Sequence, residues 1–274
     1  MKLTSWNIRG LNSPRKYKMI KKLIQQGKPQ MFFMQETKCN TITLGQTISK
    51  AWLGSHTIAV DALGASGGLA IAWDERAVML TNIHASHHFI QATFYILGKN
   101  VHGHLTNVYF PQDATNRLAI LNTLTLLNST RTHPLWISGG DFNMINKLEE
   151  KRGGRNKLDN NSTHLKNFIQ INWLIDMPFN NGIHTWNNRR TETQQITSRL
   201  DRFLLSDNAI HLGGDLSASI LHLDGLDHWP ISLQWQRPRN ITRRPFHFET
   251  FWLMHPDFRN LVQSVWKSFS PLEG

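Results

Sequence analysis

The segment Leu135–Asn143, LWISGGDFN, runs from apolar residues through a glycine pair to two polar side chains, Asp141 and Asn143. Residues 135–139 are expected to form a strand, because a short apolar run that ends in glycine and polar residues is typical of a strand and its exit loop. Functional side chains are often found where a strand ends and a loop begins. The segment therefore predicts a strand that delivers a carboxylate and an amide to a candidate site.

Similar apolar runs recur along most of the chain. They predict further strands at 3–8, 31–35, 68–73, 78–83, 89–97, 102–109, 199–206 and 231–236. Helical spacing appears at 15–26, 115–127 and 161–171, and the first of these segments follows Ser13 and Pro14, a cap and a first-turn proline. Many strands with interspersed helices indicate a layered α/β or α+β domain.

The composition is that of a folded and strongly basic protein. Among 274 residues there are 30 Lys and Arg against 19 Asp and Glu, a formal charge of +11, and 40% of the residues are hydrophobic. A chain of this kind can form a large core, which excludes disorder. The charge excess indicates a polyanionic partner, since Lys and Arg that neutralise phosphates release bound counterions. Nucleic acid is the first candidate, and an anionic membrane surface is the second.

Cysteine content and hydropathy indicate an intracellular protein. Cys39 is the only cysteine, so the sequence provides neither an internal disulfide nor a Cys-based zinc site, and a reducing compartment is expected. No run approaches the roughly 18 apolar residues of a membrane span. Secretion and membrane insertion are therefore not expected.

The composition changes after Trp235. Residues 236–245, QRPRNITRRP, have almost nothing to bury, which is typical of a linker. Apolar residues beyond it share one face at helical spacing: Phe258, Leu261, Val262, Val265, Trp266 and Phe269. We expect a domain over 1–236, followed over 237–274 by a basic linker and an amphipathic aromatic tail. The tail packs either on its own domain or on a following domain from which it has been cut off.

Polar residues follow other apolar runs in the same way as Asp141 and Asn143. They are Asn7, Glu36, Asn107, Tyr109, Asp201, Asp227 and His228. Each alone is weak evidence, because a strand-terminal Asp or Asn is more often a turn former or cap. Together they match the needs of phosphodiester hydrolysis, which are a hard cation, a base for water and donors for the developing negative charge. A histidine held by a carboxylate, as His228 by Asp201, can donate to a phosphoryl oxygen.

The sequence also offers candidate residues to bind the cation and to act as the general base. Magnesium takes oxygen ligands, usually one or two carboxylates with waters and substrate phosphate, and Glu36 with Asp227 or Asn7 would supply them. Asp141 can accept a proton from water, and Asn143, two positions on, can orient that water.

Six motifs in series resemble the endonuclease/exonuclease/phosphatase superfamily: SWNIRGL, QETK, NVYFP, GGDFN, SRLDRFLLS and DHWPI. The resemblance covers the chain up to about residue 236. It implies an α+β fold, a four-layer α/β/β/α sandwich of two mixed β-sheets flanked by helices. It also implies hydrolysis of a phosphoester with a divalent metal, Mg²⁺ or alternatively Mn²⁺. The site residues it implies are Glu36, Asn7 and Asp227 around the metal, Asp141 and Asn143 at the attacking water, His228 with Asp201 at the scissile phosphate, and Tyr109 through its hydroxyl.

Within that superfamily, the chain is most similar to endonuclease domains of plant LINE-type non-LTR retrotransposons. The similar segments are WNIRGLNSP, QETK, TWNNRR, SRLDRFLLSD and the tail RPFHFETFWLMHPDF. The resemblance implies nicking of one strand of double-stranded DNA to leave a 3′-hydroxyl for primed reverse transcription. It further implies a nuclear location and, as a partner, a reverse transcriptase domain absent from this chain.

Three positions depart from the pattern of repair enzymes. Arg9 replaces an acidic residue, Leu226 replaces a serine, and Gln112 replaces an asparagine. A single-metal site becomes the expectation, and abasic-site cleavage is placed in doubt. Two alternatives stay open, an abasic-site or repair-type nuclease and a catalytically inactive DNA-binding remnant.

Basic residues near the candidate site predict contacts to DNA. Arg189 and Arg190 fall in the polar stretch 187–198, which is expected to be a hairpin tip able to enter a DNA groove, with a solvated charged turn as the alternative. Arg152 and Arg155 follow the GGDFN loop closely enough to contact phosphates beside the site.

Overall fold

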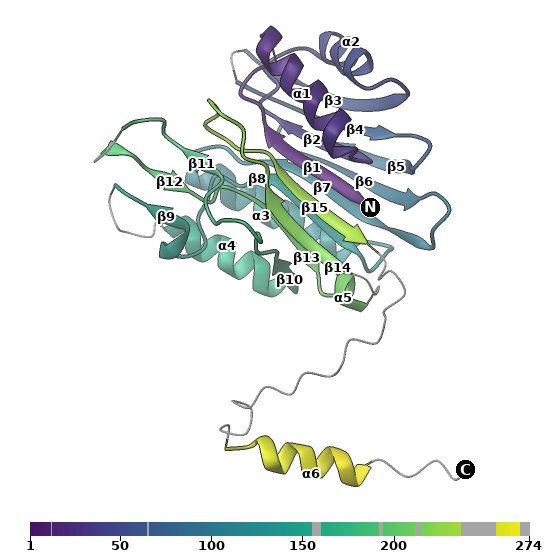
Figure 1. The fold of residues 1–274 in the computed structure, drawn as a ribbon, viewed down its shortest axis with the longest axis vertical. Helices are drawn as coiled ribbons and strands as arrows, with labels where there is room; N and C mark the ends of the chain where they lie inside the picture. The colour runs from purple at the N-terminus through teal and green to yellow at the C-terminus, as the bar shows by residue number, and fades with distance from the viewer. Residues whose placement is uncertain are drawn as a thin grey trace. The chain divides into compact units, whose positions relative to one another are not determined.

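The computed structural model describes residues 1–11, 13–64, 66–154, 160–191, 194–211, 215–236 and 256–268. The chain divides into two compact units, Met1–Arg237 and Pro238–Gly274. The first unit contains two six-stranded sheets and a small three-stranded sheet (Figure 1).

The first large sheet has the strand order β14-β15-β1-β2-β4-β3. Its strands are β1 (Lys2–Asn7), β2 (Met31–Gln35), β3 (Ser55–Leu63), β4 (Ser66–Asp74), β14 (Asp215–Ile220) and β15 (Ile231–Gln236). β1 and β2 are parallel, whereas the other pairs in this sheet are antiparallel. The sheet is therefore mixed.

The second large sheet has the order β10-β13-β8-β7-β6-β5. Its strands are β5 (Val78–Ala85), β6 (Phe89–Ile96), β7 (Val101–Tyr109), β8 (Trp136–Asp141), β10 (Leu174–Asp176) and β13 (Asp201–Ser206). Its one parallel pair is β7 with β8. The small sheet consists of β9 (Lys151–Arg152), β11 (Trp186–Asn187) and β12 (Thr197–Ser198).

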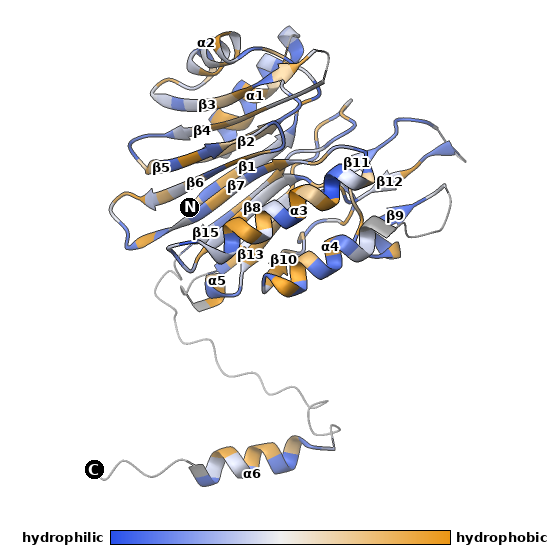
Figure 2. Ribbon diagram, turned by 180° about the vertical axis from the view of Figure 1, so that it is seen from behind, coloured by the Kyte–Doolittle hydropathy of each residue, from blue (hydrophilic) through white to orange (hydrophobic). Residues whose placement is uncertain are grey.

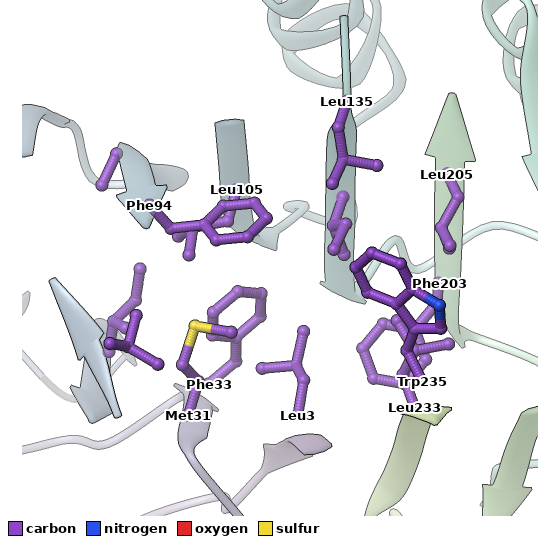
Figure 3. Packing of buried hydrophobic residues seen from close by; sticks show 14 of the residues in the cluster. Leu3, Met31, Phe33, Phe94, Leu105, Leu135, Phe203, Leu205, Leu233 and Trp235 are labelled. Carbon is purple, nitrogen blue, oxygen red and sulfur yellow. The ribbon is translucent and has the colours of Figure 1, made fainter. Parts of the chain in front are cut away.

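The two large sheets pack face to face. In β2, Met31 and Phe33 join the core between the sheets, where Phe33 lies near Leu3 of β1 (Figure 3). Phe32 and Met34 point to the opposite face of the same strand and join a second core. Successive strand residues face opposite sides, so a strand that is buried on both sides is apolar throughout. This explains the continuous run MFFMQ.

Helices cover the two outer faces. α1 (Pro14–Gly27) and α2 (Thr41–Ala51) pack on the first sheet through the second core, to which α1 contributes Ile20 and α2 contributes Ile48. α3 (Ala114–Ser129) and α4 (Asn160–Ile171) lie side by side on the second sheet, where Leu121 and Phe168 enter a third core (Figure 2). The expected four-layer α/β/β/α sandwich of two mixed sheets is confirmed.

The glycine pair of LWISGGDFN is required by close packing at the end of β8. A Cβ on Gly139 would lie 2.6 Å from the ring of Phe203, and a Cβ on Gly140 would lie 2.1 Å from the carbonyl oxygen of Val108. Gly140 also has a φ of +143°, which L-residues rarely adopt. These two glycines let β7 and β13 approach β8 just before Asp141.

A buried ion-pair network fixes the start of β13. Arg202, fully buried, donates to Glu150 at 3.0 Å and also to Asp176, and Arg199 donates to the same two carboxylates at 3.2 and 2.6 Å. Glu150 belongs to a short 3₁₀ helix (Leu148–Glu150) that leads into β9. The network thereby ties β13, which begins at Asp201, to the small sheet.

Every expected strand and helix of the first unit is present, with bounds shifted by a few residues. The apolar patterns did not predict α2, β3, β9, β10, β14, the 3₁₀ helix or the short helix α5 (Asn208–His211). α2 contains Gly45 and several Thr and Ile residues, which have weak helix propensity, and tertiary packing of Leu44 and Ile48 overrides it. β3 is an edge strand that is only partly buried, so its apolar alternation is weak.

In the second unit, α6 (Phe258–Ser268) contains all but one of the residues of the predicted apolar face. Phe269, the remaining residue, lies outside the described residues, as do residues 237–245 of the predicted linker and 246–255 of the predicted tail. Within the part of the chain that the structure describes, no helix is both long and apolar enough to span a bilayer.

Candidate active site

Most of the predicted site residues lie at strand ends that meet at one end of the sandwich, whereas Asp227 and His228 lie in the loop between β14 and β15. Asn7 ends β1, and Glu36 directly follows β2, the parallel neighbour of β1. Tyr109 ends β7 and pairs in register with Asp141, the last residue of β8, which in turn pairs with Asp201 at the start of β13. Parallel neighbours bring their carboxyl ends to the same edge, so the topology itself assembles these side chains.

Asn7 links the two sheets at the centre of the site. Its amide nitrogen donates to Glu36 Oε1 at 3.1 Å and to Asp141 Oδ2 at 2.8 Å. The Tyr109 hydroxyl donates to the same Glu36 oxygen at 3.1 Å. Asn7, Glu36 and Asp141 are buried, so these contacts are shielded from water and hold two carboxylates in fixed positions.

His228 lies between two carboxylates. Its Nδ1 donates to Asp201 Oδ2 at 3.0 Å, and its Nε2 lies 3.9 Å from Asp141 Oδ2. Burial alone lowers the pKa of His228, but the negative charges of Asp201 and Asp141 outweigh it and raise this pKa to about 9. Trp6 Nε1 donates to the His228 carbonyl at 3.1 Å and holds the loop in place. His228 is therefore an imidazolium at neutral pH.

Asp141 is the most deeply buried carboxylate of the site. Burial raises its pKa to about 6, although the positive charge of His228 and hydrogen bonds from Asn7 and Asn143 oppose the rise. The Asn143 backbone N–H donates to Asp141 Oδ1 at 2.8 Å, while the Asn143 amide nitrogen donates to the Phe110 carbonyl at 2.6 Å. Asp141 is thus ionised at neutral pH with a basicity suited to accepting a proton.

Glu36 and Asp227 both face the guanidinium of Arg9. Arg9 Nη1 pairs with Asp227 Oδ2, and Arg9 Nε lies 3.8 Å from Glu36 Oε1. Lys38 Nζ lies 3.2 Å from the other Glu36 oxygen. Burial raises the pKa of Glu36, but hydrogen bonds from Asn7 and Lys38 and the charge of Arg9 outweigh it and hold this pKa below its usual value. The glutamate is therefore ionised.

These contacts fit the predicted cation site. The Arg9 guanidinium contacts both carboxylates that were predicted as metal ligands, so both side chains approach one cationic group. Hard oxygen donors of this kind suit Mg²⁺ or Mn²⁺. Asp141, Asp201 and His228 also have ligand atoms within 4.8 Å of one another, but a protonated His228 is a poor ligand.

Several residues of the site have left-handed backbone conformations. The φ angles are +51° at Arg9, +48° at Glu36, +52° at Lys38 and +50° at Asn143. Such conformations are costly for side chains with a Cβ and persist where the surrounding structure imposes them. Here hydrogen bonds impose them, since Gly10 N donates to the Glu36 carbonyl at 2.7 Å and Lys38 N donates to the Gly67 carbonyl at 3.2 Å.

A buried polar bridge behind the site was not anticipated from sequence. Gln35 Nε2 donates to Asn107 Oδ1 at 2.6 Å, and Asn107 Nδ2 donates to the carbonyls of Met34 and Ala70 at 3.1 and 2.8 Å. Asn107 is therefore a cross-link between β7 of one sheet and β2 and β4 of the other. Asn107 was predicted only as a polar residue near the end of a strand, and nothing local in VHGHLTNVY indicates a contact between sheets.

The predicted arginine hairpin lies beside His228. β11 and β12 pair antiparallel, and Trp186 of β11 forms a bridge with His228. Arg189 and Arg190 follow β11 and are exposed, and Arg152 lies on β9, which pairs with β12 (Figure 1). Arg152 thus lies in the small sheet, and Arg189 and Arg190 lie in the connection between two of its strands. Arg155 lies outside the described residues.

Solved structures share this fold at low sequence identity. The chain is similar to the 3′ phosphatase NExo from Neisseria bound to a product DNA hairpin (17% identity, 86% of this chain and 99% of that chain, TM-score 0.67). It is similar to an AP endonuclease from Archaeoglobus fulgidus (18% identity, 86% of this chain and 99% of that chain, TM-score 0.67). It is also similar to the endonuclease domain of TRAS1, a telomere-specific non-LTR retrotransposon (14% identity, 87% of this chain and 99% of that chain, TM-score 0.65). No curated protein sequence matches the chain.

The four-layer sandwich, with carboxylates, amides and an imidazolium at one end, defines a hydrolytic nuclease or phosphatase. The model of the Endonuclease/Exonuclease/phosphatase family matches residues 4–247. The chain belongs to this family.

Proposed function

We propose that the chain is a divalent-metal-dependent DNA endonuclease of retrotransposon origin, which nicks one strand and leaves a 3′-hydroxyl for primed reverse transcription. The observation that carries this proposal is the joint geometry of the phosphodiesterase-type site and the arginine hairpin. Asp141 and His228 form the reacting end, and Arg189 and Arg190 lie on the strand connection beside it. A net charge of +11 favours a polyanionic substrate.

The chemistry is an in-line displacement at phosphorus. Asp141 accepts a proton from water as the water oxygen bonds to phosphorus, and the bond from phosphorus to the 3′-oxygen breaks. His228, protonated and fixed by Asp201, donates a hydrogen bond to a non-bridging phosphoryl oxygen. Solvent returns a proton to the 3′-oxygen, which leaves as a 3′-hydroxyl.

Other residues position the reacting groups. Asn7 fixes Asp141 relative to Glu36, and the Tyr109 hydroxyl is bound to Glu36. Glu36 and Asp227 would hold Mg²⁺ or Mn²⁺, which supplies Lewis-acid stabilisation of negative charge on the phosphoryl group. Arg9 must release Asp227 for such a cation to bind there, since it pairs with that carboxylate.

The main alternative is an abasic-site nuclease, because the similar structures include an AP endonuclease as well as a retrotransposon endonuclease. Cleavage rates on intact duplex and on the same duplex with one abasic site separate these functions. We expect intact duplex to be nicked at a rate similar to that of the abasic duplex, and the 3′ ends produced should be extended directly by a polymerase. Cleavage confined to the abasic site would reject the retrotransposon-type activity.

The proposed reaction implies a setting for the protein. Target-primed reverse transcription requires chromosomal DNA and a polymerase, so we propose a nuclear location and a reverse transcriptase domain as partner. A catalytically inactive DNA-binding remnant is the alternative from another class. Metal-dependent turnover excludes that alternative, whereas salt-sensitive DNA binding alone supports it.

A further inference from the structure

A pocket of about 250 Å³ is lined in part by Tyr109, whose hydroxyl donates to Glu36, whereas Asp141 does not line it. Leu63 and Pro111 provide apolar walls, and His87, His88 and Gln112 provide polar ones. Drug-sized ligands occupy pockets of roughly 300 to 1,000 Å³, so this pocket has room for a single flat ring system.

The pocket is held rigidly to the candidate active site. Tyr109 N donates to the His88 carbonyl at 2.9 Å, which fixes the loop before β6 to the end of β7. Across the pocket, Thr37 N and Lys38 N donate to the carbonyls of Gly68 and Gly67 at 3.1 and 3.2 Å. Both walls are therefore positioned by residues that adjoin Glu36.

One residue that lines the pocket, His88, has a buried ring nitrogen, Nδ1, without a hydrogen-bond partner among the described residues. A buried donor or acceptor without a partner is costly and is usually satisfied by water or a ligand. Gln112, exposed at the rim, adds an amide that can both donate and accept. The Gln112 amide and the His87 and His88 rings that line the pocket suit a planar heterocycle with mixed donors and acceptors at its edge.

The sheet order places this pocket along the path of a bound strand. From β13 through β8 and β7 to β6, the strand ends carry Asp201, Asp141, Tyr109 and then His88. Two strand spacings, about 10 Å, separate β8 from β6. The first sheet repeats this order from β1 to β2 and β4, with Asn7, Glu36 and then Gly68.

We propose that this pocket binds a nucleobase of the cleaved strand on the side of the leaving 3′-oxygen, and so influences which phosphodiester is cut. The inference rests on the proposed function, because in-line attack by water at Asp141 sends the leaving oxygen to the opposite face. Tyr109 lines the pocket and donates to Glu36, so we place the leaving oxygen on the side of Glu36 and Tyr109.

Two ligands of equal charge test the proposal. One is a deoxydinucleotide with both bases, and the other carries an abasic spacer in place of the 5′ base. Resonances of the His87 and His88 imidazoles report binding to the pocket. The complete dinucleotide should shift them and bind about fivefold or more tightly than the spacer analogue, since stacking of one base contributes about 1–3 kcal/mol. Equal affinities for the two ligands would overturn the proposal.

Variants then assign the effect to the pocket. Gln112→Ala and, separately, His88→Ala should remove most of the difference between the two ligands. His56→Ala, at the other end of β3, is the matched control and should keep the difference. The Gln112 variant alters an exposed side chain, so it remains informative if His88→Ala disturbs the loop. A difference that survives both pocket variants would contradict the assignment.

The same experiment separates this inference from the proposed function. If metal-dependent nicking is absent but the base-dependent affinity is present, the nuclease proposal fails and the base pocket stands. If nicking is intact but the two dinucleotides bind equally, only the base pocket fails. With nicking intact, the Gln112 variant should also relax base preference immediately 5′ of the nick.

Discussion

Asp201→Asn replaces the carboxylate that holds His228 with a neutral amide of nearly the same shape. In the parent protein His228 Nδ1 donates to Asp201 Oδ2 at 3.0 Å. Burial lowers the pKa of His228, and the charges of Asp201 and then Asp141 raise it to about 9. Without the Asp201 charge, only the remaining carboxylates oppose the lowering of the His228 pKa by burial. We expect the pKa of His228 to fall to its ordinary value of about 6.5 or below.

The expected change is large enough to measure directly. A fall from about 9 to about 6.5 is a difference of roughly 3 kcal/mol between the two protonation states. At pH 7.5 the protonated fraction of His228 would drop from about 97% to about 9%. Because the pKa is raised in the folded state, protonated His228 stabilises the metal-free fold fully below about pH 6.5. That contribution is lost as pH rises through about 9.

Imidazole resonances of His228, followed by NMR in metal-free protein from about pH 5 to 10, give the pKa without reference to activity. Asp74→Asn is the control, since it removes a carboxylate that pairs with Arg76 away from the site. It should leave the His228 titration unchanged. A parent midpoint near 6.5, or the same midpoint in parent and Asp201→Asn, would refute the electrostatic reasoning.

Three further variants test other parts of the account. Arg9→Gln should tighten Mn²⁺ binding by up to about fivefold, because it frees Asp227 from a partly exposed ion pair. Calorimetry without DNA measures this affinity, and weaker binding would show that Arg9 does not compete with the cation. Arg202→Met should lower the free energy of unfolding in urea by about 3–5 kcal/mol, because buried Glu150 loses an ion-pair partner. A loss below about 1 kcal/mol would contradict a stabilising role of this ion pair. Replacing Arg189 and Arg190 together with Gln should move the preferred nick positions while total nicking persists, and an unchanged cleavage ladder would refute a role in site choice.

The layered architecture was predictable because strands that are buried on both faces must be apolar throughout. Met31 to Met34 is such a run, and its residues divide between two cores. α2 and β3 were missed for the opposite reason, since packing rather than local propensity stabilises them. Local sequence carries little information about elements that owe their stability to neighbours far along the chain.

The candidate site was predictable as a set of residue types but not as a geometry. The motifs placed Asn7, Glu36 and Asp141 at strand ends, and the topology then brought them into one hydrogen-bond network. Sequence alone did not show that Arg9 pairs with Asp227, nor that Asn107 bridges the sheets. Such contacts join residues far apart in the chain, 218 positions for Arg9 and Asp227 and 73 for Asn107 and Met34, so no local sequence pattern indicates them.

The most direct test of the proposed nuclease is nicking of supercoiled plasmid DNA by the parent and by Asp141→Ala, each with Mg²⁺ and with EDTA. The account predicts relaxed circles only for the parent with Mg²⁺, while both proteins bind the DNA with similar affinity. Relaxation that persists in EDTA or with Asp141→Ala would contradict the mechanism. DNA binding by the parent without any relaxation would identify the chain as an inactive remnant.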